Sequence, residues 1–200
     1  TEMFVNNFEI WNDVFMEYTK TKDGKYEKLE QKNVDTGMGL ERIVAILQDK
    51  ETVFEIGSFA PIIERLIEIA KIKNVGKIQK SVRIIADHVR AATFILAEGI
   101  RPSNVERGYI LRRLIRRAIR HGKLLGVERE FLTDLAKVVM DAYKSDYPSL
   151  EKNKKFILDE LKKEDLKFRN TLSKGLRKFD SIAKKTKKIG GRDAFLLFQS

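Results

Sequence analysis

Two charged residues flank a Gly-x-Gly sequence formed by Gly37 and Gly39. Asp35 could hold a cationic group, and Arg42 could hold a phosphate, because a guanidinium donates two parallel hydrogen bonds to phosphate oxygens. Neither glycine has a Cβ and both accept a positive φ, so the backbone could approach a ligand closely. We expect an extended segment before this turn and a helix after it, with the helix N-terminus facing the ligand. The alternative is a purely structural turn in which Asp35 or Thr36 caps the helix.

A second candidate site is a row of six arginines between Arg107 and Arg120, which no acidic residue interrupts between Glu106 and Glu128. On a helix, five of them would share one half of the wheel, opposite the apolar residues: Arg112, Arg113, Arg116, Arg117 and Arg120. With no acidic neighbour three or four positions away, we expect these charges to remain free for an outside anion. Such a face is typical of proteins that bind a nucleic-acid backbone. A solvated surface or an acidic protein partner are the alternatives.

The charge of the chain is unevenly distributed. The 200 residues carry a net charge of +11, and residues 1–60, 61–126 and 127–200 contribute −5, +10 and +6. An acidic first segment joined to a basic remainder suggests two roles, with polyanion binding confined to the second. The absence of cysteine excludes disulfides and thiolate metal sites. His88 and His121 lack metal-ligand spacing, so we expect them to pack or to form hydrogen bonds on helices, and we expect no metal site in this chain.

The sequence is typical of a soluble cytoplasmic protein of one or two domains. No stretch approaches the roughly 20 apolar residues that a membrane span requires, and no signal peptide opens the chain. We therefore predict no membrane partner.

The periodicity of apolar residues predicts a mainly α fold. A short N-terminal β-hairpin is expected from residues 8–18 and 26–30, with a turn at residues 22–25. Its exposed aromatic residues indicate that it belongs to a larger sheet. Helical periodicity begins near Leu40 and predicts a multi-helix bundle with one long C-terminal helix, from about Leu150 to Lys185. The other expected helices cover residues 40–47, 62–70, 82–96, 107–122 and 131–143.

Four blocks of the sequence resemble, in the same order, those of the alanine-specific class II aminoacyl-tRNA synthetases. They are Glu9–Asn12 with Val14 and Phe15, then Val34–Arg42, Arg83–Arg90, and Pro102–Asn104 running into Arg107–Ala118. The second block resembles motif 3 of class II enzymes. The resemblance covers nearly the whole chain. It implies that residues 1–58 end a class II catalytic domain, whose antiparallel sheet would include the hairpin, and that residues 59–200 form a helical tRNA-recognition domain.

In this family the catalytic domain makes alanyl-adenylate from L-alanine and ATP and transfers the alanyl group to tRNA. The resemblance implies that Arg42 binds the γ-phosphate of ATP beside Gly39, and that Glu9 is a ligand of ATP-bound Mg²⁺. These contacts act by electrostatic positioning, and no residue of this chain is expected to form a covalent intermediate. The residues implied for L-alanine are Asp35 for the ammonium group, Asn12 for a second polar contact and Gly37 for an open pocket floor.

The helical part is expected to recognise the acceptor stem of tRNA(Ala). In this family a G·U wobble pair at the third position identifies the tRNA, and Asn104 matches an asparagine of the contact region. A side-chain amide can both donate and accept hydrogen bonds at base edges in the RNA minor groove. Set apart from the family, Asn104 could equally be a turn residue before a helix. Phosphate contacts that would fix the register are expected from Arg107, Arg112, Arg113, Arg116 and Arg117.

Other parts of the family pattern are absent from this chain or differ in it. Gln199 stands where the family has an aspartate that reads the same base pair. Motifs 1 and 2, the editing domain with its zinc, and the C-terminal oligomerisation region are missing. We therefore expect a fragment that cannot catalyse by itself. A stand-alone, non-enzymatic RNA-binding helical module and a basic scaffold for acidic proteins are the alternatives.

Overall fold

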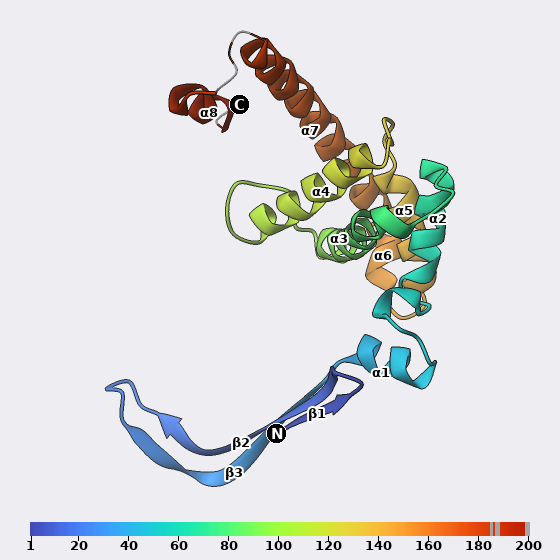
Figure 1. Cartoon of the computed structure of the whole chain (residues 1–200). Helices are drawn as coiled ribbons and strands as arrows, with labels where there is room; N and C mark the ends of the chain where they lie inside the picture. Colours follow the sequence, from blue (N-terminus) through green and yellow to red (C-terminus); the bar gives the residue numbers. More distant parts are fainter. Residues whose placement is uncertain (185, 187–188, 199–200) are drawn as a thin grey trace. The chain divides into compact units, whose positions relative to one another are not determined.

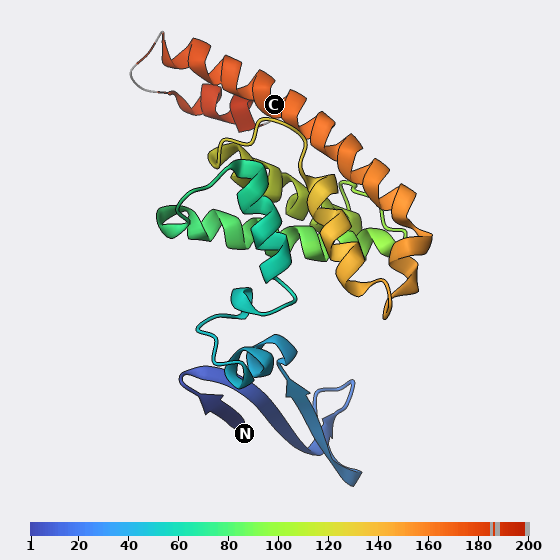
Figure 2. The same cartoon turned by 90° about the vertical axis from the view of Figure 1, so that its right-hand side faces the viewer.

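A computed structural model of the chain describes residues 1–184, 186 and 189–198 (Figures 1 and 2). The chain divides into two compact units, which we call the N-terminal unit (residues 1–60) and the helical unit (residues 61–200). This division falls two residues after the boundary expected from the sequence. In the described part of the chain, no helix is both long enough and apolar enough to cross a membrane.

The N-terminal unit is an antiparallel sheet followed by a short helix. The strands β1 (Glu2–Val5), β2 (Phe8–Lys20) and β3 (Tyr26–Met38) pair in the order β1-β2-β3. The predicted hairpin is therefore confirmed, but β3 continues eight residues beyond the expected end at residue 30. These residues lack an apolar alternation, and their pairing with β2 makes them a strand. Strand β1 was not expected, and α1 (Leu40–Leu47) follows β3 as predicted.

The helical unit confirms the mainly α fold. Two short 3-10 helices accompany the α-helices, at Val53–Glu55 in the N-terminal unit and Gly76–Ile78 in the helical unit. The α-helices of the helical unit are α2 (Ala60–Ala70), α3 (Gln79–Ala97), α4 (Glu106–Leu124), α5 (Leu132–Tyr143), α6 (Pro148–Lys152), α7 (Lys154–Ala183) and α8 (Gly191–Phe198).

Helix α3 lies at the centre of the helical unit, where it contacts α4, α5, α6 and α7 (Figure 2). Ile85 and Leu96 of α3 and Leu111 and Ile115 of α4 are fully buried. Burial of these side chains fixes the face of α4 that points inward, so the opposite face is left to the arginines. The apolar half of α4 is narrower than expected, because Ile110 is 51 % exposed.

The predicted long C-terminal helix is two helices, α6 and α7, which meet at Asn153. The amide nitrogen of Asn153 donates to the carbonyl oxygen of Ala97 at 2.8 Å, which ties the break to the end of α3. Asparagine is unfavourable in the interior of a helix, because its side chain tends to form hydrogen bonds with backbone groups. Helix α7 continues to Ala183 as one long element (Figure 1). Helix α8 was not expected.

Candidate functional sites

The Gly-x-Gly sequence joins β3 to α1 as expected. Gly37 lies in β3, and Gly39 precedes the first residue of α1 and donates its N–H to the carbonyl oxygen of Ile10 at 3.1 Å. Neither glycine uses a positive φ. A Cβ on Gly39 would lie 3.0 Å from Cδ of Arg42, whereas one on Gly37 would meet nothing within 4 Å. Gly39 therefore makes room for the Arg42 side chain, and Gly37 leaves open space beside the sheet.

Strand pairing gathers the predicted ligand residues on one face of the sheet. Asn12 pairs with Gly37, and Val14 pairs with Asp35, so Asn12, Gly37 and Asp35 share a face. A β-bulge in β2 leaves Ile10 without a partner on β1, so that Trp11 pairs with Met3 and Glu9 pairs with Phe4. Asn12 pairs with Glu2, and since Glu2 and Phe4 lie two residues apart on β1, Glu9 and Asn12 lie on the same face. Without the bulge, Glu9 would point to the opposite side.

Arg42 lies next to Glu9. Its Nη1 donates to the Glu9 carbonyl oxygen at 2.7 Å and lies 3.6 Å from the Glu9 carboxylate oxygen Oε2. The two side chains are 48 % and 37 % exposed, so both can still meet a ligand. The structure thus brings together the cation predicted for a phosphate and the carboxylate predicted for Mg²⁺. A single carboxylate beside phosphate oxygens fits Mg²⁺, which keeps several water ligands. No group of three or more His, Asp or Glu among the described residues could hold a metal alone.

Glu2 is a candidate site residue that sequence reasoning missed. The amide nitrogen of Asn12 donates to Glu2 Oε1 at 3.4 Å. Both residues line a shallow depression at the edge of the sheet, together with Thr1, Phe4, Asp13, Val14 and Phe15. Glu2 belongs to β1, the strand that carried no clear sequence signal, so its place beside Asn12 could come only from the pairing of β1 with β2.

One arginine of α4, Arg116, has an acidic partner within the helical unit. Arg116 Nε donates to Glu164 Oε1 at 2.6 Å, and its guanidinium lies 5.2 Å from the Phe168 ring centroid, both on α7. The expectation that acidic partners are absent is therefore wrong for Arg116, because Glu164 lies 48 positions away in the sequence. Arg107, Arg113 and Arg117 are exposed, and none has an ion pair within 4 Å among the described residues. Their guanidinium groups are therefore accessible to an anion, and the charge of Arg117 also contributes to lowering the pKa of Asp87.

Asn104 lies two residues before the start of α4 and is held against the first turns of this helix. Arg112 Nη1 donates a hydrogen bond to Asn104 Oδ1. The preceding residue, Ser103, accepts from the Val105 N–H and donates to the Val105 carbonyl oxygen through the same hydroxyl. Its own N–H donates to the Gly108 carbonyl oxygen at 3.0 Å. A Cβ on Gly108 would lie 2.3 Å from Ser103 Oγ, so glycine is what allows the loop to approach the helix.

Tyr109 lies beside this loop and was also missed from the sequence. The guanidinium carbons of Arg112 and Arg113 lie 5.5 and 5.6 Å from the centroid of its ring. Tyr109 is 38 % exposed. Cation–π contacts of this kind hold guanidinium groups while leaving their N–H donors available. The sequence did contain a signal for this contact. Arg112 and Arg113 follow Tyr109 by three and four residues, and side chains at these spacings are neighbours on a helix.

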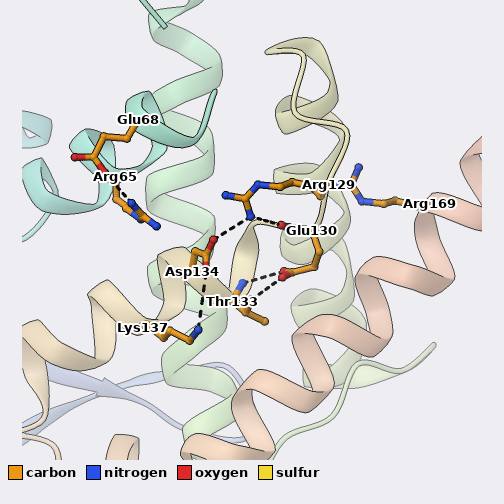
Figure 3. Close-up of polar contacts among 8 residues, drawn as sticks. All are labelled: Arg65, Glu68, Arg129, Glu130, Thr133, Asp134, Lys137 and Arg169. Carbon is orange, nitrogen blue, oxygen red and sulfur yellow. Dashed lines mark hydrogen bonds and ion pairs between the residues drawn. The ribbon is translucent and has the colours of Figure 1, made fainter. Parts of the chain in front are cut away.

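Contacts from α7 hold the loop that follows α4. Arg169 donates from Nη1 to the Glu128 carbonyl oxygen at 2.9 Å and from Nη2 to the Arg129 carbonyl oxygen at 2.8 Å, while its Nε donates to Asp165 at 2.7 Å. Figure 3 shows Arg169 beside Arg129, and the polar contacts that follow at the start of α5. There Glu130 accepts from the N–H of Thr133 at 2.9 Å. The loop that leads from the arginine helix to α5 is therefore held by α7.

The two histidines confirm the structural role expected for them. His88 Nδ1 lies 2.8 Å from the Asp87 carboxylate, and this hydrogen bond is the main reason that the pKa of Asp87 lies below its usual value. His121 Nδ1 lies 3.0 Å from Ser81 Oγ. Burial lowers the pKa of His121, and the nearby charges of Arg117 and Arg120 lower it further. His121 is therefore neutral at neutral pH and adds no charge to the arginine face.

Gln199, the residue expected at the position of the family's second base-pair contact, lies outside the residues that the structure describes.

Comparisons with known proteins agree with the resemblance. The family model for class II tRNA synthetases (A) matches residues 4–200. Relatives include an alanine–tRNA ligase of Treponema pallidum (strain Nichols), 45 % identical over 96 % of this chain and 33 % of its own length. The alanine–tRNA ligase of Borreliella afzelii (strain PKo) is 47 % identical over 96 % of this chain and 34 % of its own length. Alanine–tRNA ligase 1 of Lachnoclostridium phytofermentans is 43 % identical over 96 % of this chain and 23 % of its own length. The chain thus spans between 23 % and 34 % of the length of these relatives.

Proposed function

The chain belongs to the class II tRNA synthetases (A), and on that premise we propose that it is the part of an alanine–tRNA ligase that binds the acceptor stem of tRNA(Ala). The helical unit supplies the RNA contacts, and the N-terminal unit supplies contacts to ATP and L-alanine. The observation that carries this proposal is the position of Asn104, which the Arg112 hydrogen bond and Gly108 hold at the start of the arginine helix.

Affinity and specificity come from different residues of the helical unit. Arg107, Arg113 and Arg117 bind phosphates of the acceptor stem and set its register. Asn104 reads the third base pair from the minor groove, where a short amide side chain reaches base edges. Arg116 contributes little to RNA affinity, because Glu164 already neutralises it.

In the N-terminal unit, Arg42 holds the γ-phosphate of ATP with Gly39 beneath its side chain. Glu9 supplies one oxygen to the ATP-bound Mg²⁺. Asp35 and Asn12, which share a face of the sheet, hold the ammonium group and a second polar atom of L-alanine, and Gly37 leaves the space that the substrate needs. Motifs 1 and 2 of the family are missing, so these contacts are too few for adenylate formation by the 200 residues alone.

A titration with two RNA hairpins tests the acceptor-stem function. The hairpins copy an acceptor stem and differ only in a G·U or a G·C pair at the third position, and fluorescence anisotropy at fixed salt gives the Kd of the 200-residue chain for each. We expect about tenfold tighter binding to the G·U hairpin, since one base-edge contact is worth about 1–3 kcal/mol. Asn104→Ala should remove the preference and keep most of the affinity. Equal binding of both hairpins by the unchanged chain would contradict base reading.

A separate assay tests the expected lack of catalysis. ATP–pyrophosphate exchange with L-alanine should be undetectable for the 200-residue chain. Measurable exchange would show that these residues suffice for adenylate formation and would overturn that part of the proposal.

A further inference from the structure

Arg112 differs from the other arginines of α4 in what its guanidinium contacts. It is half-buried, lies over Tyr109 and donates to Asn104 Oδ1, whereas its neighbour Arg113 is exposed and shares only the contact with Tyr109. An arginine whose only role is a phosphate contact would direct all of its terminal donors at solvent. One of its terminal nitrogens is instead directed at the side chain of Asn104.

This hydrogen bond determines which way the Asn104 amide points. A guanidinium has donors and no acceptor, so Arg112 can bind only the oxygen of the amide. Asn104 is exposed, and its nitrogen has no hydrogen-bond partner among the described residues. With the oxygen held by Arg112, the NH₂ group is the part of the amide that remains available to a ligand.

We propose that Arg112 is a positioning residue that fixes the Asn104 amide with its NH₂ group outward, so that the chain reads its RNA through a hydrogen-bond acceptor. The acceptors in the minor groove are pyrimidine O2, purine N3 and the ribose 2′-hydroxyl oxygen. This inference rests on the proposed acceptor-stem function and assigns to Arg112 a role in specificity instead of a phosphate contact.

The local backbone supports a fixed loop. Glu106, two residues after Asn104, has a φ of 49°, a left-handed conformation that residues with a Cβ rarely adopt. Strained residues of this kind persist where the surrounding contacts determine the conformation and are frequent at binding sites. Here the contacts are the Ser103 bonds to Val105 and the close approach to Gly108. The loop therefore holds the Asn104 backbone, and Arg112 holds its side chain.

Arg112→Ala and Arg113→Ala form a matched pair for the test. Each removes one positive charge and one contact with Tyr109, and Arg112→Ala alone removes the bond to Asn104. The readout is the ratio of the Kd values for the G·C and G·U hairpins, measured on the 200-residue chain. This ratio is insensitive to a common loss of affinity or to an inactive fraction. We expect Arg112→Ala to reduce a ratio of about ten to about two or less, and Arg113→Ala to keep it while weakening both complexes.

Asn104→Asp tests the direction of the amide. Aspartate keeps an oxygen for Arg112 but has no donor to offer, so its ratio should fall to that of Asn104→Ala. In the double variant Asn104→Ala with Arg112→Ala, the ratio should equal that of Asn104→Ala alone, because Arg112 acts only through Asn104.

The outcomes separate the two proposals. If the unchanged chain does not distinguish the hairpins, base reading by Asn104 is wrong, and this inference is wrong with it. If it does and Arg112→Ala keeps the full ratio, Arg112 does not orient the reader, and the acceptor-stem function stands. Retained discrimination in Asn104→Asp would show that the amide oxygen is the reading atom, which also overturns the inference.

Discussion

Arg116 Nε donates to the Glu164 carboxylate at 2.6 Å, and this pair joins α4 to α7 through a side chain of Glu164 that is only 8 % exposed. The bond gives one arginine of a cationic helix a structural task. Arg117, one position after it, and Arg113, three positions before it, lie on the exposed face and keep their charge for a ligand. Residues of the same type within three turns of one helix therefore serve different purposes, and their substitutions should have separable effects.

The first prediction concerns the stability of the α4–α7 contact. Arg116→Met should lower the free energy of unfolding by about 3 kcal/mol, because it leaves the buried Glu164 carboxylate without a partner. Arg117→Ala, on the exposed side of the same turn, should change it by no more than about 0.5 kcal/mol. Urea unfolding followed by circular dichroism measures both. The double variant Arg116→Met with Glu164→Leu should recover most of the loss. Equal effects of Arg116→Met and Arg117→Ala would contradict the structural role of the pair.

The second prediction concerns the salt dependence of RNA binding. A plot of log Kd against log salt concentration has a slope that reflects the number of phosphates neutralised. Arg113→Ala and Arg117→Ala should each reduce this slope by about one. Arg116→Met should leave the slope unchanged, since Glu164 already holds that guanidinium. Titrations of one hairpin between low and physiological salt give the slopes. A slope reduced by the Arg116 substitution and not by the others would reverse the assignment.

The helices of the chain could be predicted because their signals are local. The apolar periodicity of α3 and α4 and the glycines that follow them are properties of neighbouring residues. The five helices predicted before the long C-terminal one agree with the structure to within a few residues. The turn between β2 and β3 was likewise evident from Asp23 and Gly24, whose φ is 85°.

The remaining features depend on residues that are distant in sequence. Glu164 forms an ion pair with Arg116 because α7 packs on α4. No sequence pattern around either residue predicts this pair. The bulge at Ile10, which turns Glu9 toward the face of Asn12, arises from pairing with β1. The break at Asn153 depends on the carbonyl group of Ala97. The candidate residues themselves were found from their types and spacing, and which of them have partners could be learned only from the packed structure.

The third prediction concerns two glycines in helices. Gly108→Ala should destabilise the chain by about 1–3 kcal/mol, because the new Cβ would lie 2.3 Å from Ser103 Oγ and 2.5 Å from the Arg101 carbonyl oxygen. Gly175→Ala, in α7, meets nothing within 4 Å and should stabilise it by about 0.5–1 kcal/mol. Urea unfolding should therefore give opposite signs. Gly108→Ala should also reduce the preference for the G·U hairpin, because it displaces the loop of Asn104. Tolerance of Gly108→Ala in both assays would show that the loop is not held against α4.

The fourth prediction concerns pH and Asp165, which is 2 % exposed. Burial raises the pKa of this carboxyl above its ordinary value of 3.8, against the opposing effect of its bond to Arg169. Between pH 3.8 and the raised pKa of the folded state, Asp165 is more protonated in the folded than in the unfolded chain. The free energy of unfolding therefore falls as pH rises through this range. Asp165→Asn removes this dependence. The stability of the variant relative to the unchanged chain should therefore increase as pH rises from about 3.8 and then level off.

A second carboxyl supplies the control for this measurement. A hydrogen bond from Lys144 lowers the pKa of Asp141 below 3.8, so its ionisation favours the folded state. The stability of Asp141→Asn relative to the unchanged chain should fall as pH rises toward 3.8, which is the opposite sign, and the difference should be small because Asp141 lies at the surface. Urea unfolding at several pH values between 3 and 7 measures both series. A relative stability of Asp165→Asn that declines with rising pH would mean that the bond to Arg169 outweighs burial, and that α7 holds the α4–α5 loop through an ionised pair.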